Sequence, residues 1–141
     1  MTIYERPVNY YETDKMGIVN NANYLHYLEE ARLYYLTANG FSFTELEKQG
    51  IYSPTSKIEI SYKTPLAFGD TIQVETALVE VTAVRFIFSY RIYNKEKKTL
   101  AAVARSEHCF ADKDGRLIIL SRRDKDLAER ITKLVEKELA Q

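Results

Sequence analysis

Residues 22–38 read ANYLHYLEEARLYYLTA, and this stretch decides how the rest of the chain must be arranged. Its apolar residues recur at helical spacing, at positions 25, 28, 31, 35 and 36. Tyrosines at positions 24, 27 and 34 widen the apolar stripe, so most of the helix needs a protein cover. Asn39 and Gly40 supply residues that commonly end a helix. We therefore predict one long, buried helix over residues 22–38.

Downstream of this helix the apolar period changes from helical spacing to two, which is the spacing of strands. The alternation predicts strands at residues 58–62, 72–78, 84–92 and 99–111. At Val79 the apolar phase shifts by one residue, which predicts a bulge or a strand buried on both faces. The turns at Gly69-Asp70 and at 94–98 are short, so we expect the four strands to form an antiparallel meander.

The two ends of the chain complete the expected fold. A short strand over residues 6–11 precedes the helix, and residues 45–50 are read as a polar connection. Asp114-Gly115 predicts a turn before a short extension at 117–120, and Ser121 with Asp124 resembles the capping pair of a terminal helix. We expect one α+β domain over residues 1–141, an antiparallel sheet wrapped around the long helix with a C-terminal helix, which is the hotdog arrangement.

Composition excludes several classes of protein. Twenty basic and twenty acidic residues give zero net charge, so no overall attraction to nucleic acid or to anionic membranes is expected. One cysteine permits no intrachain disulfide, and neither a leader-like apolar run nor a membrane span of about 18 apolar residues is present. We expect a soluble, cytoplasmic protein, and its eleven tyrosines suit packed sheets and subunit interfaces.

The histidines and the cysteine give no strong site. His26 and His108 have no partners at metal-ligand spacing, so no metal site is expected. His108 and Cys109 are adjacent on a strand, so their side chains point to opposite faces and cannot form a dyad. We expect Cys109 to be a small core residue and His108 a packed or surface strand residue. His26 is expected to form local ion pairs with Glu29 and Glu30.

The loop from Glu12 to Asn23 is the remaining candidate site. It places an acid, Asp14, and two polar residues, Asn20 and Asn21, just before the apolar helix. A helix start presents free N–H groups with partial positive charge, which can stabilise the oxyanion of acyl transfer. Asp14 could attack an acyl carbon or deprotonate a water molecule. The alternative is that these residues only organise a turn and cap the helix, and spacing alone leaves both readings open.

The same loop and helix resemble a known family, the 4-hydroxybenzoyl-CoA thioesterases of the hotdog proteins, in their bacterial short acyl-CoA branch. The signature residues are Tyr11, Asp14, Gly17, Val19, Tyr24, Glu29, Ala31 and Arg32. The match continues at Ile60, Tyr62, Pro65, Phe68, Gly69 and Asp70 and covers roughly the first 110 residues.

The resemblance implies an acyl-CoA thioesterase. Asp14 would be its nucleophile or general base, the backbone amide of Asn21 its oxyanion donor, and Gly17, Asn20 and Tyr24 would bind substrate. A homodimer or homotetramer with the substrate channel between subunits is implied, with no cofactor beyond the coenzyme A of the substrate. Nearer relatives often carry histidine at the position of Asn21, so a mechanism that needs an imidazole in the loop is in doubt.

Cations for the coenzyme A phosphates are the least specific expectation. The candidates are Arg85, Arg122 and Arg123, with Arg91 and Lys125 as further choices. A solvated charged face is the alternative reading for each of them. Three other functions also remain open: an acyl-carrier-protein thioesterase, a hotdog dehydratase, and a non-catalytic acyl-binding protein. A dehydratase needs an acid and histidine pair, and the loop has no histidine.

Overall fold

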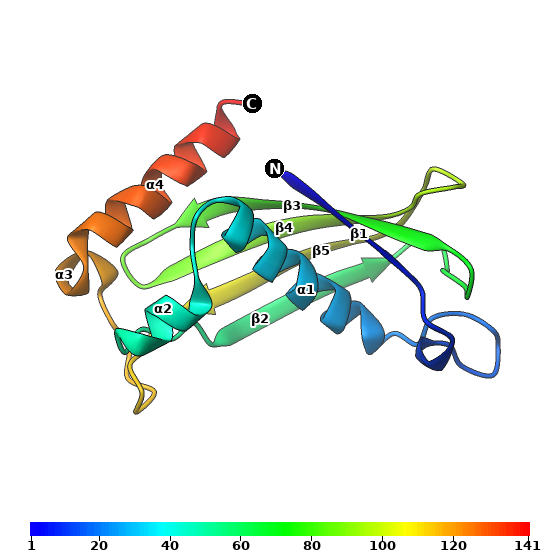
Figure 1. The fold of residues 1–141 in the computed structure, drawn as a ribbon, viewed down its shortest axis with the longest axis horizontal. Helices are drawn as coiled ribbons and strands as arrows, with labels where there is room; N and C mark the ends of the chain where they lie inside the picture. The colour runs from blue at the N-terminus through cyan, green and yellow to red at the C-terminus, as the bar shows by residue number, and fades with distance from the viewer.

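The computed structural model, which describes residues 1–141, is a five-stranded antiparallel sheet with helix α1 (Asn23–Ala38) across one face (Figure 1). The strand order is β1-β3-β4-β5-β2. The strands are β1 (Thr2–Pro7), β2 (Thr55–Tyr62), β3 (Thr71–Val81), β4 (Arg85–Asn94) and β5 (Thr99–Cys109). A C-terminal helix, α4 (Lys125–Leu139), lies beside β3. The expected α+β hotdog fold is confirmed.

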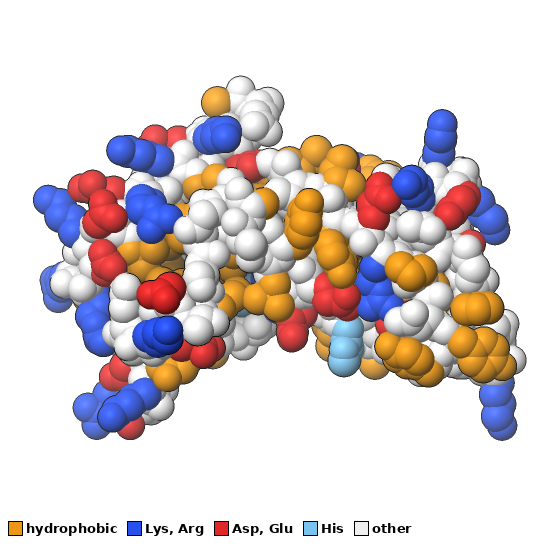
Figure 2. All heavy atoms as spheres, viewed as in Figure 1, with side chains coloured by type: hydrophobic (Ala, Val, Ile, Leu, Met, Phe, Trp, Pro, Cys, Tyr) orange, Lys and Arg blue, Asp and Glu red, His pale blue; other side chains and the backbone are white.

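Helix α1 packs one of its faces against the sheet. Its buried side chains are Tyr24, Tyr27, Leu28, Ala31 and Tyr35, none more than 3% exposed. The opposite face is open, because Leu25, Leu33 and Tyr34 are each more than 40% exposed. The expected helix bounds are confirmed, whereas the expected cover over most of the helix is wrong for the single chain, since the sheet reaches only one side. Figure 2 shows apolar side chains on this surface.

The expected four-strand meander is wrong for β2. Strands β3, β4 and β5 do follow one another as a meander, and the bulge near Val79 is confirmed as a register shift between Leu78 and Glu80. Strand β2, however, pairs with β5 at the far edge of the sheet. The connection from Tyr62 to Thr71 is therefore not a hairpin. It passes the start of α1, where the Val19 N–H donates to the Leu66 carbonyl at 2.8 Å.

Three local elements also differ from expectation. The first strand ends at Pro7, and residues 10–12 form a 3-10 turn because the Glu12 carboxylate accepts the Asn9 N–H. Residues 43–48 form a short helix, α2 (Phe43–Lys48), whose start is capped by Ser42. The signal Ser42-x-x-Glu45 could have revealed it.

The segment after β5 is not a strand. Leu117 makes a single bridge to Ala111, and residues 120–123 form a helical turn, α3 (Leu120–Arg123). Ser121 lies within that turn, and Asp124 alone caps α4 by accepting the Leu127 N–H at 3.0 Å. None of the helices is long and apolar enough to cross a membrane.

The imidazole of His108 is buried in a chain of hydroxyl groups, and only 2% of the residue is exposed. Its Nε2 lies 2.7 Å from the Ser106 hydroxyl, and its Nδ1 lies 3.1 Å from that of Thr55. The Tyr90 hydroxyl continues the chain at 2.6 Å from Ser106 and accepts a hydrogen bond from Arg32. His108 is therefore a packed strand residue, as expected.

Cys109 and His26, which the sequence also did not favour as a site, both differ from expectation. Cys109, the last residue of β5, is half-buried with its Sγ 3.9 Å from the Pro54 carbonyl, so it is not the expected core residue. His26 is exposed and forms no ion pair. The expected pairing fails because Glu30 binds Arg6 of β1 instead.

Burial, aided by the nearby Arg32 charge, lowers the pKa of His108 to about 3 from an ordinary 6.5. Between these values the unfolded chain binds a proton that the native protein excludes, so stability falls as pH is lowered. From about pH 7 to about pH 5, we expect the parent to lose ~2 kcal/mol more unfolding free energy than His108→Gln. Urea unfolding at fixed protein concentration measures this difference, and equal losses would show that the pKa of His108 is not lowered in the native protein.

Candidate active site

The loop before α1 holds Asp14 in a tight turn at the surface. The Asp14 N–H donates to the Ile18 carbonyl, and the Asp14 carbonyl accepts the Gly17 N–H, both at 2.9 Å. One carboxylate oxygen accepts the Met16 N–H at 2.8 Å, and the other has no partner within the chain. Gly17 closes the turn with a φ of +80°, which favours glycine. The turn therefore presents an ionisable oxygen that is free to act on a ligand.

The start of α1 leaves one backbone amide unused. Asn20 accepts the Ala22 N–H through its side chain and the Asn23 N–H through its carbonyl, each at 3.0 Å. The expected side-chain cap on the first helical turn is absent, because the cap residue is Ala22. The Asn21 N–H makes no hydrogen bond within the chain. A free N–H at a helix start favours negative charge on a nearby ligand.

Asp14 and Asn21 line the same cleft, together with Tyr24 of the helix. The cleft has a volume of about 360 Å³, enough for a small-molecule group. Its other wall is the end of β2 and the segment after it, made of Tyr62, Lys63, Thr64 and Pro65. The structure thus brings together three of the five expected site residues, whereas Gly17 and Asn20 shape the loop without lining the cleft.

Tyr24 and Tyr62 form the aromatic wall of this cleft. Their rings meet edge to face with centroids 4.9 Å apart, and the Tyr62 hydroxyl donates to the Asn21 carbonyl at 3.3 Å. Burial raises the pKa of Tyr24 to about 12, with the neighbouring Tyr62 adding to the rise, so its hydroxyl stays protonated at neutral pH. These contacts fix the carbonyl side of Asn21 and leave its N–H free.

Sequence reasoning missed Glu12, the most connected residue of the loop. Its carboxylate is buried and accepts from Arg6, from the Asn9 N–H and from the Tyr27 hydroxyl. The neighbouring residues Tyr10, Tyr11 and Thr13 form no periodic apolar pattern with Glu12, so no signal in the sequence marks Glu12 as buried. Nowhere do three His, Cys, Asp or Glu side chains come together to hold a metal ion.

The three arginines expected to bind phosphate lie at the other end of the sheet. Arg85 opens β4, and Arg122 and Arg123 lie in α3, opposite the Asp14 loop (Figure 1). Because β4 has ten residues, Arg85 lies about 30 Å from its far end, which is beside the loop. Arg85 pairs with Glu107 at 3.5 Å, and Arg123 donates to the Gln49 carbonyl. Lys63 is the cation that lines the cleft in the same chain.

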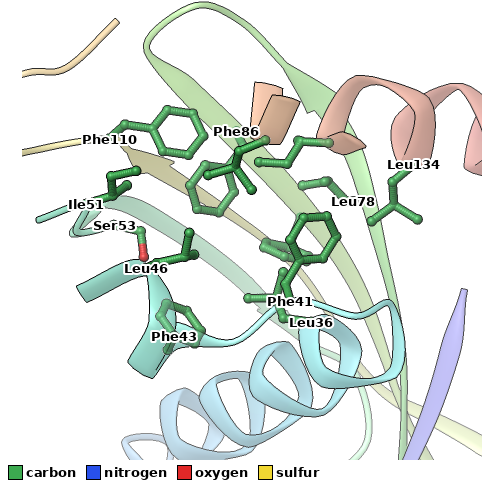
Figure 3. A pocket seen from close by; sticks show the side chains of 13 residues that line it. Leu36, Phe41, Phe43, Leu46, Ile51, Ser53, Leu78, Phe86, Phe110 and Leu134 are labelled. Atoms are coloured by element: carbon green, nitrogen blue, oxygen red, sulfur yellow. The ribbon is translucent and has the colours of Figure 1, made fainter. Parts of the chain in front are cut away.

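A second hollow lies at the C-terminal end of α1 (Figure 3). Apart from Ser53, its lining is entirely apolar and includes Phe41, Phe86 and Leu134. With a volume of about 40 Å³ it holds little more than one or two small molecules the size of water, and it contains no acid. The Asp14 cleft, at about 360 Å³, is larger than this hollow and combines an acid with a free backbone N–H.

Comparison with known proteins agrees with this fold. The family model of the thioesterase-like superfamily matches residues 8–137. YneP of Bacillus subtilis (strain 168), whose name assigns it provisionally as an acyl-CoA thioesterase, is 40% identical over 111 residues, which are 79% of this chain and 80% of YneP. The acyl-CoA thioester hydrolase YbgC of Escherichia coli O157:H7 is 30% identical over 101 residues, 70% of this chain and 75% of YbgC.

A solved structure is similar over nearly the whole chain. The DHNA-CoA thioesterase from Staphylococcus aureus superposes with a TM-score of 0.89 and 34% identity, covering 94% of this chain and 89% of its own. The residues matched by the family model, 8–137, begin just after β1 and include the Asp14 loop, α1, the whole meander and most of α4. The chain therefore belongs to the thioesterase-like superfamily and has its hotdog fold.

Proposed function

We propose that the protein hydrolyses acyl-CoA thioesters to a free acid and coenzyme A. The observation that carries this proposal is the placement of a free Asp14 oxygen and a free Asn21 N–H in one cleft. Acyl transfer needs both features, an oxygen nucleophile or base and a donor for the oxyanion. Relatives named as acyl-CoA thioesterases, together with the resemblance to the 4-hydroxybenzoyl-CoA thioesterases, support this substrate class.

The proposed reaction assigns one role to each group. Asp14 either attacks the thioester carbonyl carbon or removes a proton from a water molecule that attacks it. The carbonyl oxygen gains negative charge and receives a hydrogen bond from the Asn21 N–H, strengthened by the dipole of α1. If Asp14 attacks, the carbon–sulfur bond breaks to leave a mixed anhydride with Asp14, and water then hydrolyses this anhydride to the free acid and the Asp14 carboxylate. If Asp14 acts as base, the oxygen of the attacking water stays on the carbon as the carbon–sulfur bond breaks. On either route a proton from the water passes to the departing sulfur, and coenzyme A leaves as a thiol. Tyr24 and Tyr62 give one wall of the cleft an aromatic surface.

The phosphate groups of coenzyme A need cations, and the single chain offers one beside the cleft. Lys63 lines it and forms no ion pair. Arg85, Arg122 and Arg123 could serve the cleft of another subunit if the chain forms the dimer or tetramer implied by the resemblance. Strand β2, an edge strand with mostly exposed residues, is free to join such an assembly.

Asp14→Asn removes the nucleophile or base and keeps the size of the side chain. We expect kcat/KM for short acyl-CoA esters to fall by ~10² or more. Release of coenzyme A, followed with a thiol reagent, measures this across a panel of chain lengths. Parent-like hydrolysis by the variant would refute the site. Activity of the parent on carrier-protein thioesters alone would change the proposed substrate, and activity on neither would favour a binding protein.

Asn21 offers a matched pair of substitutions, because the proposed donor is its backbone and not its side chain. Asn21→Pro removes the N–H without breaking any hydrogen bond of the chain, and proline is tolerated beside a helix start. We expect kcat to fall by about 10² in Asn21→Pro and to change by less than about threefold in Asn21→Ala. Equal losses in the two variants would assign the effect to the side chain instead.

A further inference from the structure

Glu12 is a buried carboxylate only two residues from Asp14. The residue is 3% exposed, and its Oε1 accepts three hydrogen bonds, from Arg6 and the Asn9 N–H at 2.7 Å and from the Tyr27 hydroxyl at 3.0 Å. The Arg6 guanidinium also lies 4.8 Å over the Tyr27 ring. Burial and the bond to Glu12 raise the pKa of Tyr27, so its hydroxyl remains a donor. Glu12 is thereby tied to both β1 and α1.

The backbone of the same residue holds the other end of the loop. Its carbonyl accepts the Asn20 N–H and the side-chain amide of Asn23, both at 2.9 Å. Between these points the loop closes on itself, because Thr13 bridges to Val19. Asp14 therefore lies two residues after Glu12. Asn21 lies one residue after Asn20, whose N–H donates to the Glu12 carbonyl. Glu12 thus contacts both ends of the segment that carries the acid and the free N–H.

Stability is a weak reason to bury such a pair. Removing two charges from water costs about as much free energy as their attraction returns. Apolar residues of similar volume often stabilise a fold equally well. Three donors on one oxygen do, however, restrict the carboxylate to a single position, and catalysis is sensitive to displacements of about 1 Å. We infer that Glu12 is a positioning residue, which holds Asp14 and the Asn21 N–H at working distance. This inference rests on the proposed thioesterase function.

A double-mutant cycle separates positioning from general stabilisation. Glu12→Gln keeps the shape of the side chain and removes its charge. We expect kcat for a short acyl-CoA to fall about tenfold or more with KM within about twofold, at a temperature well below unfolding of both proteins. In an Asp14→Asn background, the same change should lower the residual rate by less than about twofold, because its effect acts through Asp14.

Glu30→Gln is the matched control. Glu30 binds the same Arg6 at 2.8 Å, but it does not contact the loop, and its side chain is 36% exposed. We expect its kcat to stay within about twofold of the parent. If Glu12→Gln does not fold, Tyr27→Phe removes one of the three donors and should lower kcat by about threefold, again only when Asp14 is present.

The outcomes keep the two proposals apart. If Asp14→Asn lowers hydrolysis by the expected factor while Glu12→Gln retains kcat, the positioning role is refuted and the proposed function stands. Multiplicative losses in the double variant, or an equal loss in Glu30→Gln, would also refute it, since either shows a general effect on the fold. If Asp14→Asn hydrolyses as fast as the parent, the assignment of the site and the role of Glu12 both fall, whereas a parent that is inactive on acyl-CoA would refute the proposed function itself.

Discussion

The burial of one face of α1 is the constraint on which the rest of the structure depends. Tyr27, Leu28, Ala31 and Tyr35 are fully buried, and fully burying an apolar side chain contributes roughly 1.5–3 kcal/mol. A helix of this length needs a whole sheet to cover that face. Since α1 follows β1 and precedes β2, the chain must pass around it, and the two strands end at opposite edges of the sheet. The connections at the start of α1 are thereby drawn together.

This crowding at the helix start is what creates the cleft. The loop before α1 and the segment after β2 meet there, joined by the Val19–Leu66 hydrogen bond and the Ile18–Ala67 bridge. Strand β2 supplies Tyr62 as a wall, and the helix supplies both Tyr24 and a backbone end with partial positive charge. The cleft needs no element beyond those that already enclose the helix. Its chemistry therefore depends on loop residues, while its position depends on the core.

The sequence predicted those parts of the fold that depend on periodicity. Helix α1, the alternation of the strands and the bulge after Leu78 all follow from spacing along the chain. The pairing of β2 with β5 could not be predicted in this way, because alternation says which face a residue occupies and not which strand lies beside it. Likewise, the loop pointed to Asp14 and Asn21, but their shared cleft depends on Tyr62, forty-one residues beyond Asn21.

Glu12 and Asp14, the two acids of this loop, lie in different environments. Arg6 forms an ion pair with Glu12, and the Glu12 Oε1 accepts three hydrogen bonds. Only 3% of Glu12 is exposed. Such a carboxylate is a poor nucleophile, because its electron density is already shared and a substrate cannot reach it. Asp14 is exposed, forms no ion pair and keeps one oxygen without a partner. The environment of each acid, and not its residue type, suits Asp14 to the proposed reaction and Glu12 to the inferred positioning role.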